Sequence, residues 1–189
     1  MKKNYNMSYL FFIYFCLKYK LINLWTRFSI KGRRKACGYL VRRSAKQVGS
    51  NLFVNTLSNV TKNTILGNNV SFNGMTIRGE GNVKIGNNFH SGAGCLIMTT
   101  YHNYDNGSAI PYDSTYYHKD VTIEDNVWLG TNVTILGGVT IGEGAIIQIG
   151  SVVVSNIPPL AIAGGHPAKV YKYRDNQHYN KLKNEEKFH

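Results

Sequence analysis

The chain has 189 residues, enough for one domain with a buried core and short extensions. Its 19 glycines and four prolines exclude a collagen-like chain, and its three cysteines (Cys16, Cys37 and Cys95) fit neither a disulfide framework nor a zinc site, which favours a reducing compartment. The net charge of +12 is confined to one end, because residues 1–50 hold twelve of the 22 basic residues and none of the ten acidic ones.

The N-terminal segment, residues 1–50, combines this charge with many aromatic residues. Its apolar run Met7–Leu17 is about half the ~20 residues that a spanning helix needs, and no A-x-A cleavage site follows it. We therefore predict a helix over Tyr9–Phe28 that lies on a membrane surface beside the cationic clusters of residues 31–43. A helix that caps the core, with its cations solvated, is an equally open interpretation. No nucleic-acid-binding motif accompanies the charge, so we expect no nucleic-acid partner.

A six-residue repeat fills Ile123–Ile157, in the units IEDNVW, LGTNVT, ILGGVT, IGEGAI, IQIGSV and VVSNI. The first position is aliphatic in every unit: Ile123, Leu129, Ile135, Ile141, Ile147 and Val153. The fifth position is small or branched: Val127, Val133, Val139, Ala145, Ser151 and Ile157. Gly, Asn and Asp fill much of the space between them, as tight turns require.

A period of six suits neither a helix nor a plain alternating strand, but it suits a short strand followed by a corner. Three such units would close a triangular coil, and coils stacked about 4.8 Å apart would bury a column of aliphatic side chains. An ordinary parallel sheet would need long helical crossovers, which this segment lacks.

Upstream, the same frame is weaker, and one extra residue falls in its middle. Its first positions are Val54, Val60, Leu66 and Phe72, and then Gly79, Ile85, Ser91 and Ile97. The frame breaks completely over residues 103–120 (NYDNGSAIPYDSTYYHKD). We predict that this segment is a loop projecting from the solenoid, the kind of segment that often carries function.

The segment VTIEDNVWLGTNVTILGGVTIGEGAIIQIGSVVVSNIPPLAIAGGHPAKV resembles the hexapeptide-repeat acetyltransferases, above all the O-acetyltransferases of capsule, colanic-acid and O-antigen synthesis and the maltose and galactoside enzymes. In AGGHPAKV, His166 replaces the usual Asn. The resemblance implies an all-β, left-handed parallel β-helix over residues 51–168, followed by a partly helical tail at 169–189. It also implies acetyl-CoA as donor, no metal, and a homotrimer with active sites between subunits.

By the same resemblance, His102 opens the loop at the position of the family's general base. It would take the proton from the acceptor hydroxyl as the oxygen attacks the thioester, a role that suits imidazole near neutral pH. The other two histidines of this region, His90 and His118, are predicted to be structural or to face the acceptor.

The resemblance assigns two further groups of residues. The predicted acetyl-CoA contacts are Trp128, Gly130, Thr131, Gly150, Ser151, Lys169 and Lys172. The predicted acceptor contacts are Asn73, Tyr101 and Asp105, of which Asn73 could equally be a turn residue and Asp105 a solvated carboxylate. Trp128 could also pack at a subunit interface. The family often has arginine where Lys169 and Lys172 stand, and a small alanine where Ile149 stands.

The sequence therefore predicts an acetyl-CoA-dependent O-acetyltransferase that acts on a sugar hydroxyl during bacterial surface-polysaccharide synthesis. The expected location is the cytoplasm, at the inner face of the membrane if residues 1–50 bind it. Two alternatives stay open: N-acetylation of a nucleotide-linked amino sugar or of a xenobiotic, and a non-enzymatic β-helix scaffold at a membrane surface.

Overall fold

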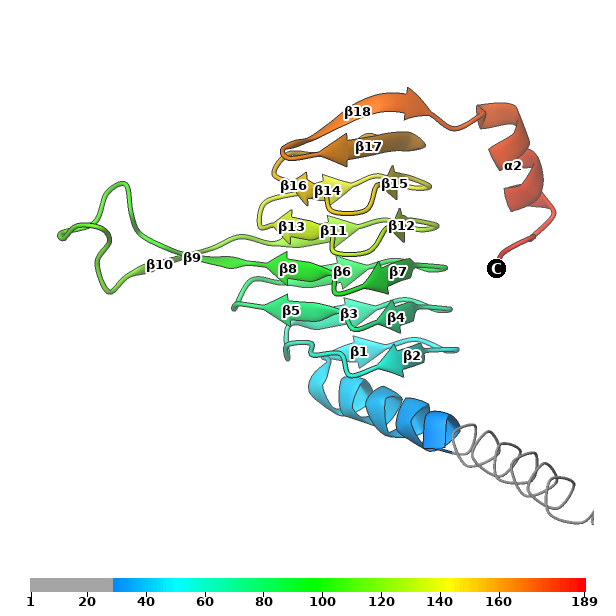
Figure 1. The fold of residues 1–189 in the computed structure, drawn as a ribbon, viewed down its shortest axis with the longest axis horizontal. Coiled ribbons are helices and arrows are strands. Elements are labelled where there is room, and N and C mark those ends of the chain that lie inside the picture. Colours follow the sequence, from blue (N-terminus) through cyan, green and yellow to red (C-terminus); the bar gives the residue numbers. More distant parts are fainter. Residues whose placement is uncertain (1–28) are drawn as a thin grey trace, which may run out of the picture.

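The computed structural model describes residues 29–189, and the predicted surface helix Tyr9–Phe28 lies outside this range. The described chain is a parallel β-solenoid with a helix at residues 29–44 across its first coil and an arm that projects sideways (Figure 1). This confirms the predicted fold class, with its N-terminal helix and protruding loop. Within the described range, no helix has the length and apolar character needed to cross a bilayer.

Three sheets form the three sides of the coil. Sheet A contains β1 (Gln47–Val48), β3 (Thr64–Leu66), β6 (Val83–Ile85), β11 (Val121–Ile123) and β14 (Thr140–Ile141). Sheet B contains β2 (Phe53–Thr56), β4 (Ser71–Asn73), β7 (His90–Ala93), β12 (Trp128–Leu129), β15 (Ile146–Ile147), β17 (Ala161–Gly165) and the antiparallel β18 (Ala168–Tyr173). Sheet C contains β5 (Thr76–Arg78), β8 (Leu96–Met98), β13 (Thr134–Leu136) and β16 (Val152–Val153). The arm contains β9 (Thr100–His102) and β10 (Tyr116–His118).

The aliphatic first positions of the repeat form the core. In Ile123–Ile157, Ile123 is 1% exposed and the other five first-position side chains are 0% exposed. Equivalent residues of successive coils lie in register, as Ile97, Ile135 and Val153 do in sheet C. Each coil thus places its branched side chains directly against those of its neighbours, which is the packing that the period predicted.

Gly79 does not occupy the first position that the sequence frame gave it. Ile77 does, because it pairs with Ile97 and is 3% exposed. Gly79 lies at the next corner with φ of +100°, where a Cβ atom would stand 2.4 Å from Oγ1 of Thr99. The extra residues of this coil are therefore in the corner after β5, a place that hydrophobic spacing alone does not reveal.

Ser91 departs from the aliphatic rule but keeps its place in the frame. It pairs with Leu129 and is 3% exposed. Phe72 lies in β4, which pairs with the strand of Ser91, and Phe89 directly precedes that strand. The two rings are fully buried and meet edge to face with centroids 6.0 Å apart, so a small residue at Ser91 suits a coil with two large side chains.

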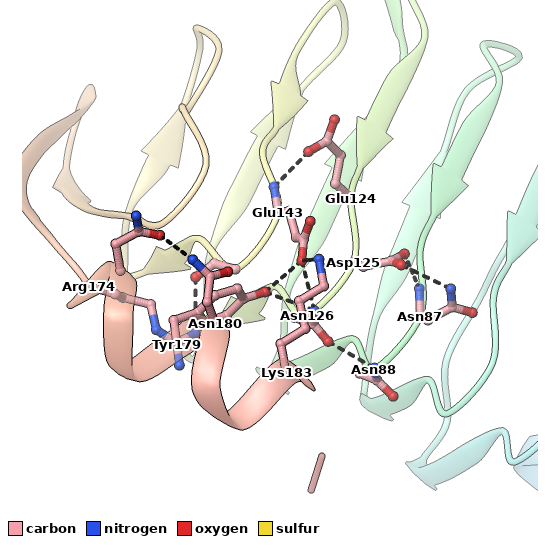
Figure 2. Close-up of polar contacts among 12 residues, drawn as sticks. Asn87, Asn88, Glu124, Asp125, Asn126, Glu143, Arg174, Tyr179, Asn180 and Lys183 are labelled. Carbon is pink, nitrogen blue, oxygen red and sulfur yellow. Dashed lines mark hydrogen bonds and ion pairs between the residues drawn. The ribbon is translucent and has the colours of Figure 1, made fainter. Parts of the chain in front are cut away.

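Asparagines form a ladder along the corner between sheets A and B. Asn69, Asn88 and Asn126 all have φ between +53° and +62°, a conformation that Asn tolerates better than most residues. Nδ2 of Asn69 donates to Oδ1 of Asn88 (3.0 Å). Nδ2 of Asn88 in turn donates to Oδ1 of Asn126 (2.8 Å) (Figure 2). The corner residues thereby link the coils through side chains as well as backbone.

The C-terminal helix α2 (Asn176–Asn184) closes this ladder. Its Tyr179 hydroxyl donates to Oε1 of Glu143 (2.9 Å) and accepts from Nδ2 of Asn126 (2.8 Å), while Nζ of Lys183 lies 2.6 Å from Oε1 of Glu143 (Figure 2). Burial raises the pKa of Glu143, but hydrogen bonds from Lys183 and Tyr179 outweigh it, so the pKa is lowered overall. Burial and the bond to Glu143 raise the pKa of Tyr179 to about 12.

Candidate active site

The arm leaves the solenoid at the corner between sheets C and A, since it follows β8 and precedes β11. Its base is an antiparallel hairpin in which His102 pairs with Tyr116, so residues 116–118 of the predicted loop form a strand. The hydroxyl of Tyr101 donates to the carbonyl of Met98 (3.2 Å) and accepts from the backbone N–H of Gly137. These two bonds anchor the hairpin to the coils.

The imidazole of His102 lies between two tyrosines of the arm. Its ring stacks on Tyr112, with centroids 3.8 Å apart and an interplanar angle of 23°, and lies 4.7 Å from the ring of Tyr116. Nδ1 of His102 is buried and has no hydrogen-bond partner within residues 29–189. The ring is therefore fixed by stacking, while one of its nitrogens is left without a partner from its own chain.

Asp113 organises the outer part of the arm. Its carboxylate accepts hydrogen bonds from the hydroxyl (2.5 Å) and the backbone N–H (2.9 Å) of Thr115 and from the backbone N–H of Ser108 (2.9 Å). These bonds, led by that of the Thr115 hydroxyl, lower the pKa of Asp113 to about 2. Asp105 is exposed in the same part of the arm.

Most of the predicted acetyl-CoA contacts gather at the corner between sheets B and C, here called the B–C corner. Gly130 and Thr131 follow β12, and the N–H of Gly150 bonds the carbonyl of Thr131 (2.8 Å) in the next coil. The buried hydroxyl of Ser151 accepts from the N–H of Gly165 (3.1 Å). The predicted set therefore forms a stack over three successive coils.

Lys169 joins this corner, and two other predicted contacts lie on the adjoining wall. Lys169 lies at the start of β18, directly after the turn that follows β17, and pairs with Gly164 of β17. Trp128 and Lys172 share one outward row of sheet B, since Trp128 pairs with Ile146, Ile146 pairs with Ile162, and Ile162 pairs with Lys172. Trp128 is 54% exposed on this wall.

Asn73 is not close to the arm of its own chain. It ends β4 in sheet B, on the opposite side of the solenoid in Figure 1. Its side chain accepts from Nδ2 of Asn55 (2.6 Å) and donates to the carbonyl of Ser91 (2.6 Å). These bonds link three coils, so Asn73 has a structural role whatever else it contacts.

The two remaining histidines of this region have partners. Nδ1 of His118 lies 2.9 Å from the hydroxyl of Thr100 across the hairpin. His90 lies in sheet B beside Trp128, and its Nε2 is 3.2 Å from the carbonyl of His189. Among the described side chains, no group of three His, Cys, Asp or Glu is arranged to hold a metal ion.

Sequence reasoning did not find Tyr112 and Tyr116, the two rings that hold His102. A compositional signal was present, because residues 101–117 contain five of the thirteen tyrosines. Within one chain, moreover, the B–C corner and the arm are at different corners of the triangle. The predicted base and the predicted cofactor residues thus form two separate half-sites.

Comparisons with known proteins agree with this architecture. A family described as bacterial transferase hexapeptide (six repeats) matches residues 120–155. A hexapeptide-repeat acetyltransferase from Vibrio cholerae, 24% identical, has the same fold with a TM-score of 0.63, over 78% of this chain and 94% of its own. A galactoside acetyltransferase solved with coenzyme A is 25% identical, with a TM-score of 0.60, over 79% of this chain and 84% of its own.

Sequence relatives extend over part or most of the chain. The chain spans 45% and 62% of the lengths of two curated relatives, from Schizosaccharomyces pombe and Staphylococcus aureus, to which it is 39% and 33% identical. The galactoside O-acetyltransferase of Escherichia coli is 32% identical over 149 residues, which cover 75% of this chain and 72% of that enzyme. On this extended similarity, and on a solenoid with the same repeat, the chain belongs to the hexapeptide-repeat acetyltransferase family.

Proposed function

We propose that this protein transfers an acetyl group from acetyl-CoA to a sugar hydroxyl during the cytoplasmic steps of bacterial surface-polysaccharide synthesis, with His102 as general base. The observation that carries the proposal is the pair of half-sites: an imidazole clamped in the arm and a stack of predicted cofactor residues at the B–C corner. The extended similarity to a galactoside O-acetyltransferase supports a sugar hydroxyl as the acceptor.

The surface of the B–C corner suits the parts of acetyl-CoA. A Cβ atom built on Gly130 would stand 2.5 Å from the backbone nitrogen of Ile149, so the backbones of two coils approach closely here and no side chain fits between them. Ile149 is 70% exposed at this corner and offers an apolar contact for the pantetheine arm, while Trp128 offers an aromatic one on the adjoining wall. The exposed ammonium groups of Lys169 and Lys172 complement the phosphates of the nucleotide.

Bound acetyl-CoA supplies the acetyl group as a thioester. His102 takes the proton from the acceptor hydroxyl through a ring nitrogen while the hydroxyl oxygen forms its bond to the acetyl carbon. The imidazolium then returns that proton to the sulfur as the carbon–sulfur bond breaks, so proton and leaving group balance. Stacking on Tyr112 holds the ring in one orientation, which favours direct proton transfer.

A second copy of the chain would complete the site. The two half-sites lie at different corners of one solenoid, and a homotrimer would bring the arm of one subunit to the B–C corner of the next. We therefore include a homotrimer with active sites between subunits in the proposal.

Thiol release from acetyl-CoA in the presence of candidate saccharides tests the function. We expect His102→Ala to lower the rate of release about 10²–10⁴-fold without changing thermal stability. His118→Ala is the matched control, because it removes another arm histidine and should leave most of the rate. Full turnover by His102→Ala would exclude the assigned base, and acetyl transfer to amino sugars alone would favour N-acetylation.

A further inference from the structure

The helix at residues 29–44, called the capping helix, presents a cationic face away from the solenoid. Its opposite side packs on the first coil through Cys37 and Val41, which are 6% and 1% exposed. Arg34 also lies on the inner side, with its guanidinium 5.0 Å from the centre of the Phe53 ring. Figure 1 shows the helix across the end of the stack, beneath β1 and β2.

The outward side is defined by helical spacing and exposure. At 100° per residue, one half of the helix carries Lys31, Lys35, Tyr39, Arg42 and Arg43, and all five are exposed. Tyr39 is 60% exposed in the middle of these cations, and its hydroxyl accepts from Nη1 of Arg43 (3.3 Å). The outward face is therefore a cationic surface with an amphipathic side chain at its centre.

No acidic group neutralises this face. The first acidic residue of the sequence is Glu80, which lies 3.7 Å from Nζ of Lys62. Across the described part of the chain, no ion pair involves a cation of the capping helix. An uncompensated cluster of this kind attracts an anionic surface at physiological ionic strength.

We propose that the outward face of the capping helix docks on an anionic phospholipid surface, with Tyr39 at the headgroup level and Lys31, Lys35 and Arg43 on lipid phosphates. Arg42, whose Nη1 donates to the carbonyl of Gly49 (3.3 Å), adds its positive charge from the edge of this face. An apolar neighbour, Leu40, is 46% exposed and favours a lipid surface over a purely ionic partner. The apolar run Met7–Leu17 in the same basic segment adds to this preference, because it is too short to span a bilayer but suits an interface.

Docking in this way would orient the solenoid. Its coils would be stacked away from the membrane, and the arm would project from the stack after the third coil. With about 4.8 Å per coil and a helix about 10 Å thick, His102 would stand roughly 20 Å above the surface. That height suits a saccharide carried on a lipid headgroup. The match to such an acceptor rests on the proposed function, whereas the docking of the helix does not.

Binding of the full-length chain to vesicles tests the proposal without any activity measurement. The probes are vesicles of phosphatidylglycerol with phosphatidylcholine, vesicles of phosphatidylcholine alone, and a DNA duplex. Each Lys or Arg near an anionic surface strengthens binding roughly fivefold, so removing four should weaken it by roughly several hundredfold where the contributions add fully, and by no less than about tenfold where they add in part. The variant is Lys31→Gln, Lys35→Gln, Arg42→Gln and Arg43→Gln combined.

The matched control removes four exposed cations from elsewhere: Lys62→Gln, Arg78→Gln, Lys84→Gln and Lys181→Gln. The control should bind anionic vesicles within about twofold of the original chain, and neither of these two proteins should bind vesicles of phosphatidylcholine alone. Equal weakening by both sets would overturn the proposal, because net charge and not this face would then govern binding. Unchanged binding by the first variant, or stronger binding to the duplex than to the vesicles, would also overturn it.

A second measurement places the contact on the helix itself. The emission of the new tryptophan in Tyr39→Trp is obtained by subtracting the spectrum of the original chain. This emission should shift to shorter wavelength when anionic vesicles are added, as it does when an indole enters the interface. High salt should reverse the shift. An unchanged emission in a variant that still binds would mean that another part of the chain carries the contact.

Discussion

The coils of residues 121–157 and the arm of residues 100–118 differ in what holds them together. In the coils, aliphatic side chains are stacked in register and excluded from water, so each coil depends on its neighbours. In the arm, local hydrogen bonds around Asp113 and ring stacking on His102 maintain the shape, and Ile110 at its tip is 97% exposed. The coils thus supply stability, and the arm supplies a chemical group at little cost to stability.

The largest effect that separates the two regions should come from the core. Ile135→Ala removes a fully buried side chain between Ile97 and Val153, which should lower the free energy of unfolding by about 2–5 kcal/mol. Guanidinium unfolding measures this loss. Ile110→Ala is the matched control and should leave the unfolding curve in place, since its side chain is almost entirely in water. Equal losses for both would mean that the arm is part of the cooperative core.

A smaller effect, on rate and not on stability, should come from Tyr112. Tyr112→Leu removes the ring that stacks on His102, so kcat should fall about tenfold while the KM for acetyl-CoA stays the same. Tyr112→Phe keeps the ring and should restore kcat. The control is Tyr104→Leu, which removes an arm tyrosine that is 72% exposed. If Tyr112→Phe is as slow as Tyr112→Leu, the hydroxyl and not the stacking matters.

The smallest effect concerns acid pH. Because the folded pKa of Asp113 is depressed to about 2 from its ordinary 3.8, its contribution to arm order is complete above about pH 4 and is lost as pH falls through 2. The amide NMR shift of Thr115 should titrate with a midpoint near 2, and Asp113→Asn should abolish that step. A midpoint at the ordinary value would show that these hydrogen bonds do not persist in solution.

The coils could be predicted because their physics is periodic, whereas the arm could not. Ile123 to Val153 repeat without interruption, and all are buried as the period requires. Two details of the frame escaped prediction. Extra residues in the corner after β5 moved Gly79 out of the core. A shorter corner before Ile157 made this residue pair with Ile141, so it occupies a first position of the repeat and not the fifth. A corner can gain or lose residues without breaking the hydrophobic pattern on either side.

The candidate site was predictable only in part, for a related reason. The residues of the B–C corner follow the repeat, so the family resemblance placed them by register. The stacking of Tyr112 on His102 joins positions ten residues apart across an irregular loop, and no periodic rule relates them. In the proposed trimer the distance between the two half-sites would depend on how the subunits pack, which a single chain's pattern does not encode.

Mixing two inactive variants tests most directly whether the arm of one subunit serves the B–C corner of another. One variant is His102→Ala, and the other combines Lys169→Glu with Lys172→Glu. If they are unfolded and refolded together in equal amounts, about one quarter of the sites should pair an intact arm with an intact corner. Thiol release should then rise to roughly that fraction of the original rate. If the mixture is no more active than the average of its two parents, each site lies within one chain and is not formed between subunits.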